Sequence, residues 1–141
     1  MRVMGLDIGD RRIGVALSDP GARIAQPYAT IDRNKENAIE RLQSIVKEND
    51  VGVIVVGLPL NMNGSEGIQA ERTRAFVNEL REAIPDVDLT FRDERLTSVA
   101  SENVLIESGM RREKRKKHRD RVAATLILQN YLESENLRTD S

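Results

Sequence analysis

The spacing of apolar residues changes along the chain, and this change predicts the order of strands and helices. Residues 2–8 and 12–18 are two runs rich in Val, Ile and Leu that flank a short polar turn, a pattern that predicts a β-hairpin. Residues 19–21 (Asp-Pro-Gly) favour a second turn, and residues 22–31 predict a third strand. Pro27 cannot donate a backbone hydrogen bond, so this strand is expected at an edge of the sheet. The chain therefore opens with three antiparallel strands.

Helices and strands alternate in the next part of the chain. Apolar residues recur at helical spacing over residues 35–49 and 68–83, which are predicted helices. Residues 51–58 are a nearly continuous apolar run, as expected of a strand that is covered on both faces. Residues 87–91 predict a fifth strand. Three antiparallel strands followed by parallel βαβ units predict an α/β fold with a mixed five-stranded sheet and helices on both faces.

Two further helices are predicted after the fifth strand. Residues 97–98 (Thr-Ser) are N-cap candidates for the first of them, and Gly109 is its expected C-terminal cap. The last helix is predicted to begin near Asp120, and it is apolar around most of its circumference, so it should be largely buried. Residues 1–135 are predicted to form a single domain, and residues 136–141 are predicted to be a disordered tail.

Composition narrows the chemistry that the chain can perform. It contains no cysteine, which excludes disulfides, zinc–thiolate sites and cysteine nucleophiles. Its single histidine, His118, cannot build a multi-histidine metal site, so a metal would be held by oxygen ligands, which favours Mg²⁺, Mn²⁺ or Ca²⁺. No apolar run approaches the ~20 residues that span a bilayer, and no signal peptide is recognised. We therefore expect a cytoplasmic protein without a membrane partner.

The net charge of −1 conceals a strongly cationic segment. Residues 111–119 hold seven of the 22 Lys and Arg residues but only one of the 23 Asp and Glu residues. This segment is predicted to be a flexible loop, and it is either simply solvated or a binding site for the phosphates of a nucleic acid. Its basic residues are Arg111, Arg112, Lys114, Arg115, Lys116, Lys117 and Arg119.

Asp7 is a carboxylate inside an otherwise apolar strand. Strand alternation places it on the same face as Gly5 and Gly9. A charge in a central strand is costly unless it has a partner, a metal or a function, and the glycines leave room beside it for a ligand or another backbone. Two interpretations stay open: a metal ligand, or a carboxylate that accepts hydrogen bonds from the turn at residues 10–12.

Other carboxylates are expected to reach the same edge of the sheet, because sites in open α/β sheets form beyond the carboxyl ends of strands. Asp93 and Glu94 end the fifth strand, and Asp120 is expected at the start of the last helix. Together with Asp7 they would suit two Mg²⁺ or Mn²⁺ ions, one activating water and the other stabilising the leaving oxygen of a phosphoryl displacement. Each also has a structural alternative: a helix cap for Asp120, and an ion pair with a neighbouring arginine for Asp93 or Glu94.

Four motifs occur in order over nearly the whole chain: residues 5–9 running into 12–19, residues 56–65, residues 93–98 and residues 120–132. They resemble the motifs of the YqgF/RuvX family, described as Holliday-junction resolvases or pre-ribosomal-RNA nucleases with a ribonuclease H-like fold. The resemblance implies a catalytic, metal-binding acidic triad of Asp7, Glu94 and Asp120. Arg95, next to Glu94, would contact the scissile phosphate or orient the acid. Asn63 departs from an aspartate of many relatives, which argues against its loop as a metal site.

The predicted function is metal-dependent hydrolysis of phosphodiester bonds, in 5′-end processing of pre-16S rRNA during ribosome biogenesis, with ribosome-associated partners. A Holliday junction resolvase is an alternative; it would require a homodimer, for which the sequence specifies no interface. A nucleic-acid-binding factor without catalysis is another alternative. An actin-like or sugar-kinase-like ATPase is disfavoured, because such enzymes enclose the nucleotide between two domains and 141 residues supply one.

Overall fold

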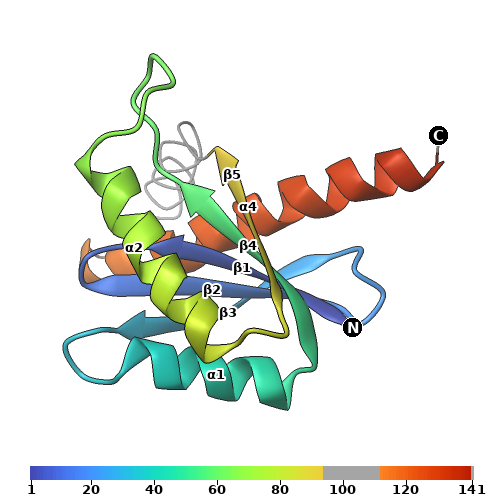
Figure 1. The fold of residues 1–141 in the computed structure, drawn as a ribbon, viewed down its shortest axis with the longest axis horizontal. Helices are drawn as coiled ribbons and strands as arrows, with labels where there is room; N and C mark the ends of the chain where they lie inside the picture. Colours follow the sequence, from blue (N-terminus) through green and yellow to red (C-terminus); the bar gives the residue numbers. More distant parts are fainter. Residues whose placement is uncertain (94–111, 141) are drawn as a thin grey trace.

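The computed structural model describes residues 1–93 and 112–140, with the side chains of residues 1–93 and 119–136 (Figure 1). Its elements are, in order, β1 (Arg2–Ile8), β2 (Arg12–Ser18), β3 (Ala25–Asp32), α1 (Ala38–Glu48), β4 (Val51–Leu58), α2 (Ile68–Ala83), β5 (Asp88–Asp93) and α4 (Arg112–Asp140). The helix predicted over residues 97–109 lies outside the described residues. The other predicted strands and helices are present, with boundaries close to those expected except at the ends of the last helix.

The five strands form one sheet in the order β3-β2-β1-β4-β5. β1 pairs antiparallel with β2, and β2 pairs antiparallel with β3, while β4 runs parallel to both β1 and β5. The predicted mixed sheet is therefore confirmed. Pro27 lies in β3 at the edge of the sheet, as its missing donor requires.

Each face of the sheet carries its own hydrophobic core. The face of β1 that presents Leu6 packs against α1 and α2, with Leu42 and Leu80 fully buried. The opposite face packs against α4, where Ala16 and Leu128 are fully buried. Figure 1 shows α1 and α2 on one side of the sheet and α4 on the other. Helices on both faces are thus confirmed, and the face that α4 covers is the one that carries Asp7.

Two glycines allow α4 to lie directly on β1 and β2. A Cβ atom at Gly14 would overlap the backbone carbonyl of Asp120. A Cβ atom at Gly5 would lie 2.7 Å from the backbone oxygen of Ala124 and 2.7 Å from Cβ of Leu128. The sequence predicted that another backbone could approach on this face, and the backbone that does so is α4.

Helix α4 begins at Arg112, so the prediction of a start near Asp120 is wrong. Asp120 lies in the third turn of the helix and does not cap it. Residues 112–119, predicted as a flexible loop, form the first two turns instead. The segment lacks Gly and Pro, and Lys and Arg are good helix formers, so α4 extends through it. The helix also continues to Asp140 across most of the predicted tail, while the domain boundary at residue 135 stays a prediction.

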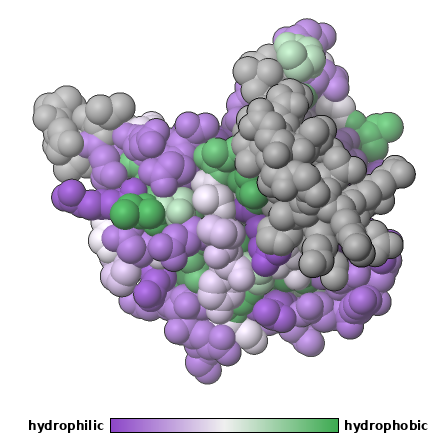
Figure 2. Space-filling model, turned by 180° about the vertical axis from the view of Figure 1, so that it is seen from behind, coloured by the Kyte–Doolittle hydropathy of each residue, from purple (hydrophilic) through white to green (hydrophobic). Residues whose placement is uncertain are grey.

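The surface is consistent with a highly charged chain. In the view of Figure 2 hydrophilic side chains cover most of the described surface, and apolar side chains form small separate patches. Within the described part of the chain, no helix combines the length and the apolar character that crossing a bilayer demands.

Candidate acidic site between the first hairpin and helix α4

Asp7 and Asp120 meet where α4 crosses the β1–β2 hairpin. Asp7 is near the carboxyl end of β1 and pairs with Gly14 of β2. The backbone of Asp120 lies directly over Gly14, because a Cβ atom at this glycine would overlap it. Two carboxylates separated by 113 positions in the sequence are thus brought to one place by a glycine that lets the helix approach.

The environment of Asp120 opposes its negative charge. Its side chain is only 15% exposed, and this burial is the main reason why the pKa of Asp120 rises from 3.8 to about 6. The negative charge of Asp7 raises the pKa further, while Arg12 and Arg119 lower it. The electrostatic influence of Asp7 on Asp120 reflects the proximity of the two acids in the fold. A cation bound between them would relieve this repulsion, so the donor set fits a hard divalent ion.

We expect Asp120→Asn to stabilise the metal-free protein at neutral pH. Because the pKa is raised on folding, the folded state holds this proton more tightly than the unfolded chain does. The contribution of Asp120 to stability therefore falls as pH rises from about 4 to about 6, and stays low above pH 6. The raised pKa corresponds to a preference of ~3 kcal/mol for the protonated carboxyl in the folded state relative to the unfolded chain. Urea unfolding in EDTA at pH 5 and pH 7.5 measures this effect. The free energy of unfolding of Asp120→Asn should exceed that of the wild type by more at pH 7.5 than at pH 5.

The control for this measurement is Asp88→Asn, because Asp88 is exposed at the start of β5. Its effect on the free energy of unfolding should be small at both pH values. Equal pH dependence in Asp120→Asn and the wild type would contradict an unfavourable charge at Asp120.

Arg12 is a member of this site that the sequence analysis did not single out. Its Nε donates to Oδ2 of Asp120 over 3.2 Å, and the two side chains are 19% and 15% exposed. Strand alternation could have indicated it, because Arg12 lies two residues before Gly14 and hence on the same face of β2. Because Gly14 pairs with Asp7, this alternation would have placed Arg12 near Asp7.

The remaining acids are placed only in part. Asp93 ends β5, beside Leu58 of β4 and two strands away from β1. Glu94 and Arg95 lie outside the described residues, as does Arg111. Over residues 1–93 and 119–136, no three His, Cys, Asp or Glu side chains are grouped to hold a metal ion. The described part of the site is therefore an acidic pair with an arginine.

The cationic segment leads straight into the acidic pair. Residues 112–119 are the two helical turns before Asp120, and the charge of Arg119 acts on that carboxylate. The basic residues predicted to bind nucleic acid in these turns are Arg112, Lys114, Arg115, Lys116, Lys117 and Arg119. The helical backbone of this segment is continuous with the turn that holds Asp120.

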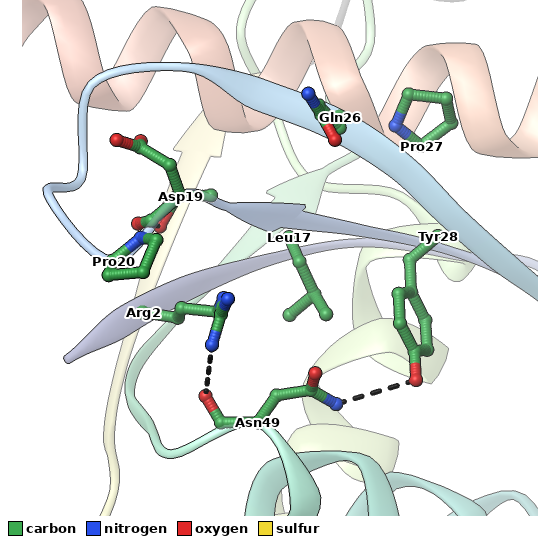
Figure 3. A pocket seen from close by; sticks show the side chains of 9 residues that line it. Arg2, Leu17, Asp19, Pro20, Gln26, Pro27, Tyr28 and Asn49 are labelled. Atoms are coloured by element: carbon green, nitrogen blue, oxygen red, sulfur yellow. Dashed lines mark hydrogen bonds between the residues drawn. The ribbon is translucent and has the colours of Figure 1, made fainter.

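A cavity of about 300 Å³ lies at the opposite end of the sheet, beside the start of β1 (Figure 3). Several of its polar groups bond to the protein: Arg2 donates to the backbone oxygen of Asn49, whose side chain donates to the Tyr28 hydroxyl. The Asp19 carboxylate, also in its lining, accepts backbone hydrogen bonds from Ile24 and Arg23, which lower its pKa. With its only carboxylate engaged in a turn, this cavity lacks the features of a metal site.

Residues 1–134 match the model of a family described as "RuvX: Holliday junction resolvase". This chain belongs to the RuvX family. The resemblance inferred from the four sequence motifs is thereby confirmed.

Similar RuvX-family proteins match over nearly their full length. One from Thermoanaerobacter pseudethanolicus is 50% identical over 138 residues, which cover 96% of this chain and 98% of the relative. One from Roseiflexus sp. is 47% identical over 135 residues, covering 95% of each. Both bear the name "Putative pre-16S rRNA nuclease".

Two solved structures of RuvC from Thermus thermophilus have the same fold as this RuvX-family chain. The one in complex with a Holliday junction substrate has a TM-score of 0.59 at 13% identity and covers 96% of this chain and 95% of its own. The other has a TM-score of 0.54 at 14% identity, with 96% of each chain covered. At such low identity the likeness concerns the fold, and it confirms the predicted ribonuclease H-like architecture.

Proposed function

We propose that this chain is a metal-dependent nuclease that cleaves pre-16S rRNA at its 5′ end during ribosome biogenesis in the cytoplasm. The observation that carries the proposal is the meeting of Asp7 and Asp120 beside Arg12, directly after the two cationic turns that open α4. Membership of the RuvX family supports a hydrolase that acts on phosphodiester bonds. The names of the relatives support the rRNA precursor as its substrate.

The catalytic and metal-binding residues that we propose are Asp7, Asp120 and Glu94. Asp7 and Asp120 offer carboxylate oxygens from a strand and a helix that pack rigidly on each other, which suits Mg²⁺ or Mn²⁺. Two such ions, when bound, supply an activated water and stabilisation of the leaving oxygen. Arg12 holds Asp120 in a fixed orientation and partly offsets its negative charge. Burial of the Asp120 side chain limits competing water.

Neutralising the basic turns of α4 should weaken binding of RNA and flatten its salt dependence. We would replace Lys114, Arg115, Lys116 and Lys117 together by Gln, which preserves helix propensity. Each lost phosphate contact should lower the slope of log Kd against log salt by about 0.7 for single-stranded RNA. Fluorescence anisotropy over a salt series measures this slope.

The matched control removes the same number of charges from the other side of the sheet. It replaces Lys35, Arg41, Lys47 and Arg81, exposed residues in or next to α1 and α2, by Gln. This variant should keep most of the wild-type slope. A quadruple variant of α4 that retains the full slope would remove these turns from the proposed interface.

A Holliday junction resolvase is the second candidate, favoured by the description of the family model. The deciding experiment compares cleavage of a labelled pre-16S rRNA fragment with cleavage of a four-way DNA junction, with Mg²⁺, Mn²⁺ or EDTA. We expect metal-dependent cutting of the RNA. Symmetrical cutting of the junction by a homodimer would favour the second candidate. Binding of either substrate without cutting would favour a non-catalytic factor.

A further inference from the structure

The guanidinium group of Arg12 is only partly used by the contacts that the structure describes. Its Nε donates to Asp120. For the two Nη groups, no acceptor is present among the described residues, and neither belongs to the buried side-chain nitrogens that lack a partner there. A guanidinium has five N–H donors in a fixed plane, so four of them stay available here.

The anchored Nε fixes the direction of the remaining donors. Because the guanidinium is planar and rigid, holding Nε on Asp120 leaves the edge formed by Nη1 and Nη2 as a two-pronged donor. Arg12 lies on the same face of β2 as Gly14, over which Asp120 sits and with which Asp7 pairs. The two-pronged edge therefore belongs to a guanidinium that is held next to Asp120. This geometry matches the two non-bridging oxygens of a phosphodiester.

The charge balance gives such a donor a purpose. Two carboxylates in one place repel a phosphate, and Arg12 is a cation in direct contact with one of them, Asp120. An ion pair with Asp120 alone would need a single donor, which a lysine could supply as well. The fork of an arginine allows a second, bidentate acceptor to be bound at the same time.

We propose that Arg12 binds a phosphate of the nucleic-acid strand at the acidic site with Nη1 and Nη2, while its Nε holds Asp120. This inference rests on the proposed nuclease function and adds a substrate contact to it. Arg12 would then be a substrate-binding residue that couples the position of the strand to that of a metal-binding carboxylate.

The test compares three variants with the wild type: Arg12→Gln, Arg12→Lys and Arg11→Gln. Arg11 is the matched control, because it adjoins Arg12, carries the same charge, is 60% exposed and faces Asp32 at 3.8 Å. The Kd of a labelled pre-16S rRNA fragment is measured in EDTA over a salt series. Mn²⁺ affinity and thermal unfolding of each variant are measured in parallel.

We expect Arg12→Gln to weaken binding roughly tenfold or more and to lower the salt slope by about 0.7, as loss of a charge-assisted phosphate contact predicts. Arg11→Gln should change Kd less than about threefold. Arg12→Lys should fold and bind Mn²⁺ like the wild type but bind RNA with intermediate affinity, because one ammonium cannot serve Asp120 and a phosphate in fork geometry.

Two results would overturn the inference, and they are distinguishable. If Arg12→Gln and Arg12→Lys bind RNA as Arg11→Gln does, and only Mn²⁺ affinity falls, Arg12 merely positions Asp120 and the nuclease proposal stands. If the wild type binds neither the RNA fragment nor a four-way junction, the proposed function fails together with the contact. Should Arg12→Gln not fold, the Arg12→Lys comparison alone decides.

Discussion

Asp7→Asn is expected to abolish cleavage of the pre-16S rRNA fragment while leaving its binding unchanged or slightly tighter. The amide keeps the size of the side chain but replaces an ionised oxygen pair by one neutral oxygen, which weakens a metal ligand. Loss of several kcal/mol of transition-state stabilisation corresponds to a rate decrease of about 1,000-fold or more. Binding should not suffer, because removing a negative charge lessens the repulsion of phosphates. Single-turnover cleavage and anisotropy measure the two effects separately.

Asp10→Asn is the matched control for this prediction. Asp10 lies three residues away in the same hairpin but is exposed, and its carboxylate pairs with Arg72 of α2 over 2.9 Å. Removing this surface pair should leave the cleavage rate within about twofold of the wild type, since exposed ion pairs contribute little. Cleavage that survives Asp7→Asn, or that falls equally in Asp10→Asn, would contradict the acidic site.

Gly14→Ala is expected to disrupt both the fold around α4 and the activity. Its Cβ atom would occupy the space of the Asp120 backbone carbonyl, and backbone cannot yield as a flexible side chain can. Either α4 shifts away from the hairpin or β2 distorts, at a cost of about 3 kcal/mol. Any such shift separates Asp120 from Asp7 and Arg12. The free energy of unfolding, measured by chemical denaturation, and the Mn²⁺ affinity of the folded fraction should therefore fall together.

The comparison with Gly67→Ala separates crowding from a general effect of replacing glycine. Gly67 precedes α2, and the nearest atoms to a Cβ there are 3.4 Å or more away, in the side chain of Asn61. This change should cost less than about 1 kcal/mol. A Gly14→Ala protein with the stability of the wild type would mean that α4 does not rest on this strand as described.

The sheet could be predicted because its signals are local. Alternation within residues 2–8 and 12–18 determines which face of the sheet each side chain points to, and the missing donor of Pro27 limits its strand to an edge. The prediction for α4 failed for a local reason as well. A run of Lys and Arg is equally compatible with a solvated loop and with the exposed start of a helix, and periodicity cannot separate the two when apolar residues are absent.

The site depended on contacts between distant parts of the chain. By itself the sequence predicted an acid inside an apolar strand at position 7, glycines that clear one face, oxygen ligands for any bound metal and membership of a nuclease family. Only the tertiary structure decided that Asp120 reaches Asp7 from the third turn of a helix, and that Arg12 holds it. The reason is physical: the Arg12–Asp120 pair joins residues 108 positions apart. Its geometry is set by where Gly14 lets α4 rest, which no local pattern specifies.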